Sequence, residues 1–179
     1  MHITTRKLAA AAVTGAAYAA LTMLLAPISY GAIQCRVSEV LCILPFFIPC
    51  TAWGLFAGCA IANLLSAAGI FDVVFGSLAT LLAALCTAWL GRGRGAQSWL
   101  RGVLAALMPV VFNFVFVGAV LTWSLTDAAF PHLNASFWLF GGQVALGEVA
   151  VLGILGLPLM RLLPRNPKFR EIIRSYQKE

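Results

Sequence analysis

Charged residues are scarce in this sequence. They make up 10% of its 179 residues, whereas hydrophobic residues make up 61%, and soluble domains carry roughly 25% charged residues. A chain with so little charge does not have water as its main solvent. Because backbone groups inside a bilayer must hydrogen bond to one another, such a chain is either helical or a closed barrel. Long apolar runs without alternation favour helices, so we predict an all-α integral membrane protein.

The sequence also lacks the motifs of several enzyme classes. It has no HExxH motif, no GxSxG motif and no Cys–His pair within helical reach, so nothing supports a hydrolase. The glycine-rich segment 91–95 lacks the Lys-Ser/Thr ending and the preceding strand of a phosphate-binding loop. We therefore expect the chain not to be an enzyme, to hydrolyse no ATP by itself and to need no cofactor.

The cysteines form no CxxC motif and no Cys/His cluster of the kind that binds a metal. All except Cys35 lie within apolar stretches, and we interpret them as small apolar side chains. The alternative is a metal or disulfide role. The five residues are Cys35, Cys42, Cys50, Cys59 and Cys86.

Apolar runs divide the chain into membrane spans. A helix needs about 20 residues to cross the hydrocarbon core, and four runs fit one helix each. They are residues 8–25, 71–90, 100–125 and 136–157. The run 37–65 is too long for one helix and short for two. Since repeats and low-complexity tracts are absent, we expect a single domain over 1–179, with a short basic tail at 161–179.

The basic residues decide the number of crossings. Every Lys and Arg except Arg36 lies in one of three blocks. The blocks are residues 6–7, 92–101 and 161–178. Loops rich in Lys and Arg stay in the cytoplasm, so an even number of helices must separate consecutive blocks. The run 37–65 must then contribute two helices, broken near residues 45–49. We predict six transmembrane helices, with both termini in the cytoplasm.

This topology brings the remaining polar residues to the outer side of the membrane. They are Gln34, Arg36, Glu39, Asn63, Asp72, Asp127 and His132. Glu39 either forms an exposed ion pair with Arg36 or acts as a first-turn acid, or it lines an outward-facing pocket. Asp72 either caps the fourth helix or binds a ligand.

Polar residues within the spans are costly in lipid. A carboxylate at that depth is strongly disfavoured, so Glu148 in the sixth helix should face the bundle interior. It is either a functional group or a protonated acid bonded to another helix, for instance through Gln143. Asn63 and Asn113 are either ligand groups or interhelical hydrogen bonds, and for Asn113 alone the second interpretation is better.

The first helix carries small residues at four-residue spacing, namely Ala12, Ala16 and Ala20. Such a stripe lets two helix backbones approach closely in lipid. The spacing by itself favours packing within the same bundle, and the alternative is a docking surface for another protein.

Six stretches of the chain have a distinctive sequence. They are residues 26–39 (APISYGAIQCRVSE), 44–47 (LPFF), 58–64 (GCAIANL), 72–80 (DVVFGSLAT), 147–148 (GE) and 156–159 (GLPL). In these stretches the chain resembles the QueT family, whose members are substrate-binding S components of energy-coupling factor (ECF) transporters in bacterial cell membranes. The likeness covers nearly the whole chain apart from its basic tail.

The resemblance implies a six-helix subunit that binds a queuosine precursor, a 7-deazaguanine base such as preQ1 or queuine, at its outer face. It also implies docking of Ala12, Ala16 and Ala20 onto a membrane scaffold subunit that works with two cytoplasmic ATPase subunits. Nucleic acid is not an expected partner. The competing hypotheses are a stand-alone small secondary carrier and a ligand-free membrane scaffold.

Such a ligand fits the polar residues of the chain. A carboxylate accepts the adjacent ring N–H and amino donors of a guanine-like edge in a two-point arrangement. An aminomethyl cation favours a second carboxylate, while Arg36 is expected to hold Glu39 in place. The candidate binding residues are Gln34, Arg36, Glu39, Asn63, Asp72, Asn113 and Glu148.

Overall fold

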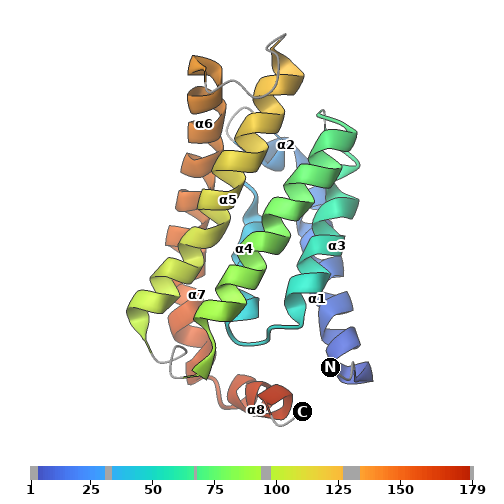
Figure 1. The fold of residues 1–179 in the computed structure, drawn as a ribbon. Helices are drawn as coiled ribbons and strands as arrows, with labels where there is room; N and C mark the ends of the chain where they lie inside the picture. The colour runs from blue at the N-terminus through green and yellow to red at the C-terminus, as the bar shows by residue number, and fades with distance from the viewer. Residues whose placement is uncertain (1–3, 31–33, 67, 94–97, 127–133, 178–179) are drawn as a thin grey trace.

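The structure is a computed structural model that describes residues 4–30, 34–66, 68–93, 98–126 and 134–177. Within these residues every regular element is helical, as predicted. The helices pack into an elongated bundle (Figure 1). The expected outer residues Asp127 and His132 lie outside the described residues, as does part of the glycine-rich segment.

Four helical segments are long and apolar enough to cross a membrane, and they coincide with the four runs predicted as single spans. Two of these segments contain a π-helical turn, and α5 contains Pro109. The segments are α1 (Thr5–Leu24), η2 (Asp72–Gly76) continued by α4 (Ser77–Leu90), α5 (Trp99–Leu125), and α6 (Ala135–Val151) continued by η4 (Leu152–Gly156), α7 (Leu157–Leu162) and η5 (Leu163–Arg165).

The ambiguous run forms two helices, broken at the predicted place. η1 (Val37–Phe46) is a 3₁₀ helix of 10 residues, and α3 (Thr51–Asn63) is an α-helix of 13 residues. A 3₁₀ helix rises about 2.0 Å per residue, so η1 extends over roughly 20 Å. Both helices are shorter than the span length of about 20 residues, and the count of six crossings stays a prediction.

The basic blocks gather at one end of the bundle. Figure 1 shows the N-terminus, the start of α5 and the C-terminal helix α8 (Pro167–Gln177) at that end, whereas the short helix α2 (Ala26–Ser29) lies near the other. The basic tail at 161–179 is helical over most of its described residues. Apolar residues of α8 pack beneath the bundle, and the Tyr176 hydroxyl donates a hydrogen bond to the Arg6 carbonyl over 3.2 Å.

Glycines set the close approach of α1 to α3. A Cβ at Gly54 would lie 1.9 Å from the Ala11 carbonyl oxygen, and a Cβ at Gly58 would lie 2.3 Å from that of Gly15. Glycines four residues apart are a known means of close helix packing in membranes. The stripe of Ala12, Ala16 and Ala20 does not make this contact, because all three residues are exposed. Packing of the stripe inside the bundle was therefore the wrong interpretation.

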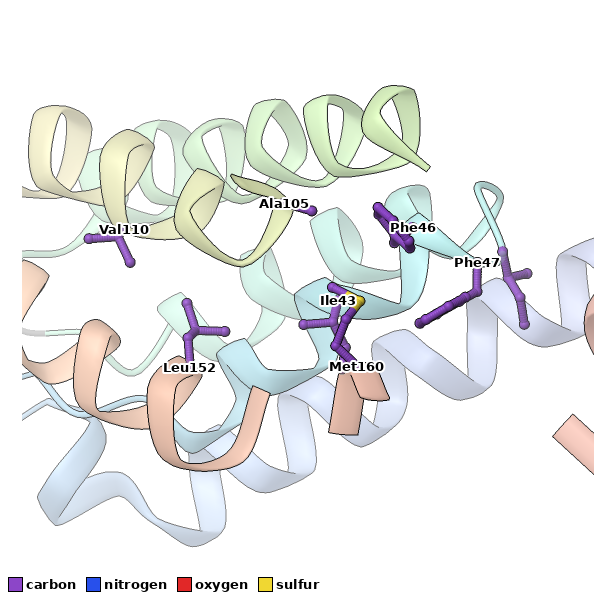
Figure 2. Packing of buried hydrophobic residues seen from close by; sticks show 8 residues of the cluster. Ile43, Phe46, Phe47, Ala105, Val110, Leu152 and Met160 are labelled. Carbon is purple, nitrogen blue, oxygen red and sulfur yellow. The ribbon is translucent and has the colours of Figure 1, made fainter. Parts of the chain in front are cut away.

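An apolar cluster fills the bundle toward its basic end. Figure 2 shows Ile43 and Phe46 of η1 facing Ala105 of α5 and Met160 of α7. Apolar residues of α8 pack against the same cluster, and the Phe47 and Phe169 rings meet edge to face at 5.6 Å. This core holds η1 in the middle of the bundle, and η1 in turn positions the polar residues at its start.

Candidate ligand-binding site

All the predicted binding residues are buried. None of their side chains is more than 6% exposed, although four of them are formally charged. Buried charges in a protein are normally paired and hydrogen bonded. The residues are Gln34, Arg36, Glu39, Asn63, Asp72, Asn113 and Glu148.

Arg36 pairs with Asp72. The Arg36 Nη2 atom lies 3.3 Å from Asp72 Oδ2, and both side chains are buried. The Asn63 amide nitrogen donates to the Asp72 carbonyl oxygen over 2.9 Å, which joins α3 to η2. The Arg36 guanidinium also lies over the Tyr30 ring, 5.6 Å from its centroid. One ion pair thus connects the residue before η1 with the start of η2.

Two of the interpretations offered for these residues are wrong. Arg36 does not pair with Glu39, because η1 turns Glu39 toward α1. The Asp72 carboxylate does not cap its helix, because it faces inward to Arg36. Arg36 is the only buried cation among the described residues, and it pairs with the Asp72 carboxylate, which faces it inside the bundle.

Both carboxylate oxygens of Glu39 have partners. The Tyr18 hydroxyl donates to Oε1 over 2.5 Å, and the Cys42 thiol donates to Oε2 over 3.0 Å. Glu39 does lie in the first turn of η1, but it is fully buried, so the exposed ion pair was wrong. Within the bundle this acid is held by the protein itself.

Two cysteines belong to the same polar cluster. Cys59 Sγ accepts hydrogen bonds from Thr80 over 3.2 Å and from Asn63 over 3.5 Å, and it lies 3.6 Å from the Tyr18 hydroxyl. Together with Cys42, it is thus more than the small apolar side chain that the sequence indicated. All five cysteines are free thiols.

Glu148 faces the interior, as predicted. Its Oε1 atom accepts a hydrogen bond from the Asn113 amide nitrogen over 2.5 Å, so its helical partner is on α5 and not Gln143. This bond also makes Asn113 the interhelical contact expected for it. The neighbouring Gly147 packs on the chain before η1, since a Cβ there would lie 2.5 Å from the Gln34 carbonyl oxygen. This contact brings the residue next to Glu148 against the segment that carries Gln34 and Arg36.

The unpaired polar atoms gather in this region. Among the described residues, every buried side-chain polar atom without a hydrogen-bond partner belongs to a predicted binding residue, except the Ser29 hydroxyl. Leaving such an atom unpaired costs about 1–3 kcal/mol. The atoms are Gln34 Oε1, Arg36 Nε, Asn63 Oδ1, Asp72 Oδ1, Asn113 Oδ1 and Glu148 Oε2.

These unpaired atoms have a clear chemical character. Arg36 Nε is a donor, whereas the others are amide or carboxylate oxygens and therefore acceptors. The orientations of the Asn63 and Asn113 amides are fixed, because their nitrogens donate to a carbonyl and a carboxylate oxygen. Three carboxylates also share the region with one guanidinium. Such a site is suited to a ligand rich in N–H donors and to positive charge.

Comparison with known proteins identifies the family. A model of the QueT transporter family matches residues 8–165. The chain is also 33% identical over 146 residues to a protein of Lactococcus lactis subsp. cremoris (strain MG1363), "Queuosine precursor transporter QueT". The aligned region covers 80% of this chain and 83% of that protein. No solved structure matches the chain. The chain belongs to the QueT transporter family.

Proposed function

We propose that this QueT family transporter is the substrate-binding subunit, or S component, of an ATP-driven ECF importer. It captures a queuosine precursor at the outer face of a bacterial membrane. The ligand then reaches the cytoplasm through a complex with a membrane scaffold subunit and two ATPase subunits. The name of the Lactococcus relative supports the class of substrate.

The observation that carries the proposal is the acceptor-rich polar cluster. A 7-deazaguanine base presents ring N–H and amino donors, and its acceptors are fewer, namely the ring carbonyl and one ring nitrogen. The unpaired atoms of the cluster have the complementary composition, with several oxygens and the Arg36 Nε donor. Because hydrogen bonds to charged groups are stronger than neutral ones, the carboxylates supply most of the recognition.

The three candidate acids have different roles in this proposal. Asp72 and Glu148 each keep one carboxylate oxygen free of protein partners. One of them accepts the paired ring N–H and amino donors, and the other faces the aminomethyl cation of preQ1. Glu39 has both oxygens engaged by Tyr18 and Cys42, so it positions the start of η1 and does not contact the base.

The topology and docking surface complete the proposal. The chain crosses the membrane six times, with the end that carries the basic blocks in the cytoplasm. The exposed stripe of Ala12, Ala16 and Ala20 on α1 docks onto the scaffold subunit. A reporter placed at residue 93 and tags at both termini should all be found inside the cell. Labelling of residue 93 from outside intact cells would contradict the topology.

Ligand extraction tests the function most directly. The protein is purified gently from cells grown with preQ1 and queuine, and mass spectrometry identifies the small molecules that it retains. A 7-deazaguanine base should be recovered, and the same base should raise the melting temperature of the washed protein. A chain that retains no base and shows no thermal shift with either compound would instead be a ligand-free scaffold.

Copurification separates the importer from the stand-alone carrier. We expect the tagged chain to bring down a membrane scaffold subunit and ATPase subunits, and uptake of the base in cells to depend on them. Saturable uptake by the chain alone in liposomes, without ATP, would identify a secondary carrier.

A further inference from the structure

A cavity lies at the basic end of the bundle. Its volume is about 230 Å³, and it is formed where the end of η1, the start of α5 and α7 meet. Phe46, Phe47 and Met160 form its floor, and Ser98, Trp99 and Arg161 line it beside them. The proposed ligand site uses none of these residues.

The cavity combines an apolar floor with a cationic rim. The floor residues are buried and belong to the cluster in Figure 2. At the rim, the Arg161 guanidinium lies over the Trp99 indole, 3.8 Å from the ring centroid. A guanidinium stacked by its face keeps its N–H edge available for a bidentate anion. Within the described part of the chain, Arg161 is exposed and makes no hydrogen bond or ion pair.

Neighbouring residues place this cavity at the depth of lipid headgroups. Trp89 at the end of α4 and Trp99 at the start of α5 are both exposed. Tryptophan is enriched where a membrane protein meets the headgroup layer. Arg92 and Arg101 follow these tryptophans closely in the sequence. The rim of the cavity therefore lies where phosphate groups of the bilayer are available.

We propose that this cavity binds an anionic phospholipid. The lipid phosphate pairs with the edge of the Arg161 guanidinium, while the glycerol and the first carbons of an acyl chain lie against Phe47 and Met160. The apolar floor favours a lipid over a free anion, which gains nothing from it. Basic pockets between transmembrane helices on the cytoplasmic side are known to suit acidic headgroups. A bound lipid bridges α5 and α7 at this end of the bundle.

The test uses the full chain, delipidated in mild detergent. Native mass spectrometry and thermal melting are recorded with phosphatidylglycerol, with phosphatidylcholine and with glycerol phosphate. We expect phosphatidylglycerol to remain bound as a one-to-one adduct and to raise the melting temperature. The zwitterionic lipid and the free phosphate should do neither at equal concentration. Equal effects of both lipids, or an equal effect of glycerol phosphate, would overturn the proposal.

Substitutions then locate the site. Arg161→Gln should weaken phosphatidylglycerol binding roughly 10-fold or more, because a charge-assisted pair is lost. Arg174→Gln removes the same charge from the exposed face of α8, away from the cavity, and should leave binding unchanged. Identical binding by the two variants would overturn the assignment. If Arg161→Gln does not fold, Arg161→Lys serves instead, since it keeps the charge and loses the bidentate edge.

Discussion

The Tyr18 hydroxyl lies 2.5 Å from Oε1 of Glu39, and this hydrogen bond joins α1 to η1 inside the bundle. A second contact of 2.6 Å between the Thr22 and Ser38 hydroxyls lies one turn further along α1. The opposite face of α1 carries the exposed alanine stripe. Hydrogen bonds therefore connect α1, the helix proposed to dock on the scaffold, to η1, whose first residues lie beside the proposed ligand site.

Replacing Tyr18 by Phe should destabilise the protein. The change leaves Glu39 Oε1 buried without its donor, which costs about 1–3 kcal/mol. The free energy of unfolding in detergent measures this loss. Tyr176→Phe is the matched control, because the hydroxyl of Tyr176 bonds a carbonyl at the exposed end of the bundle, and it should cost less than about 0.5 kcal/mol. Equal losses in the two variants would contradict a special role for the buried bond.

Replacing Glu148 by Gln should weaken binding of the 7-deazaguanine base. The amide oxygen stays with Asn113, so the amide nitrogen takes the place of the free Oε2 atom and faces the donors of the ligand. A buried clash of donors costs about 1–3 kcal/mol, or roughly 5- to 150-fold in affinity. Isothermal titration measures the change. Glu171→Gln makes the same chemical change on exposed α8 and should have no effect.

The same logic applies to Asp72→Asn, whose amide oxygen stays with Arg36. Glu39→Gln should lower stability more than affinity, because the oxygens of Glu39 are bonded to the protein. If all three amide variants bound the base like the parent chain, the site would have been placed wrongly.

Replacing Arg36 by Met should strongly destabilise the fold. It leaves the Asp72 carboxylate buried without a counter-ion, and breaking a buried ion pair in this way costs about 3–5 kcal/mol. The double variant Arg36→Met, Asp72→Asn removes both charges and should be more stable than Arg36→Met alone. Chemical unfolding of the four proteins of this cycle measures the coupling. Additive losses would mean that the two side chains do not interact.

Replacing Ala16 by Leu should separate binding from docking. Ala16 is exposed on α1, so the variant should fold and bind the base, yet no longer copurify with the scaffold or support uptake. Gly15→Leu is its neighbour on the packed face, where a Cβ would lie 2.5 Å from the Gly54 carbonyl oxygen, and it should fail to fold stably. Normal uptake by Ala16→Leu would place the docking surface elsewhere.

Local composition accounts for the parts of the fold that were predicted correctly. Hydropathy located the four long spans, and Pro45 and Pro49 marked the break that separates η1 from α3. The cost of a carboxylate in lipid also predicted that Glu148 faces inward. Each of these inferences depends on residues close together in the sequence, so a single sequence is enough to make them.

For other features the sequence gave only a partial signal or none. The 3₁₀ geometry of η1 is not encoded in its apolar run, and the sequence predicted an ordinary span there. The tail residues Phe169, Ile173 and Tyr176 are spaced at about one helical turn, which does indicate an amphipathic helix. Their packing beneath the bundle depends on the apolar cluster around Phe47, which is far away in the sequence.

The sequence by itself predicted an all-α membrane protein, and it singled out as candidate binding residues the charged and amide residues that are buried in the structure. Only the tertiary structure decided their partners: Arg36 with Asp72, Glu39 with Tyr18 and Glu148 with Asn113. It also decided that Asp72 and Glu148 keep a free oxygen while Glu39 does not. The physical reason is that a buried polar group bonds whichever group helix rotation brings within about 3 Å. That rotation is set by packing between segments far apart in the chain, such as Gly147 against Gln34.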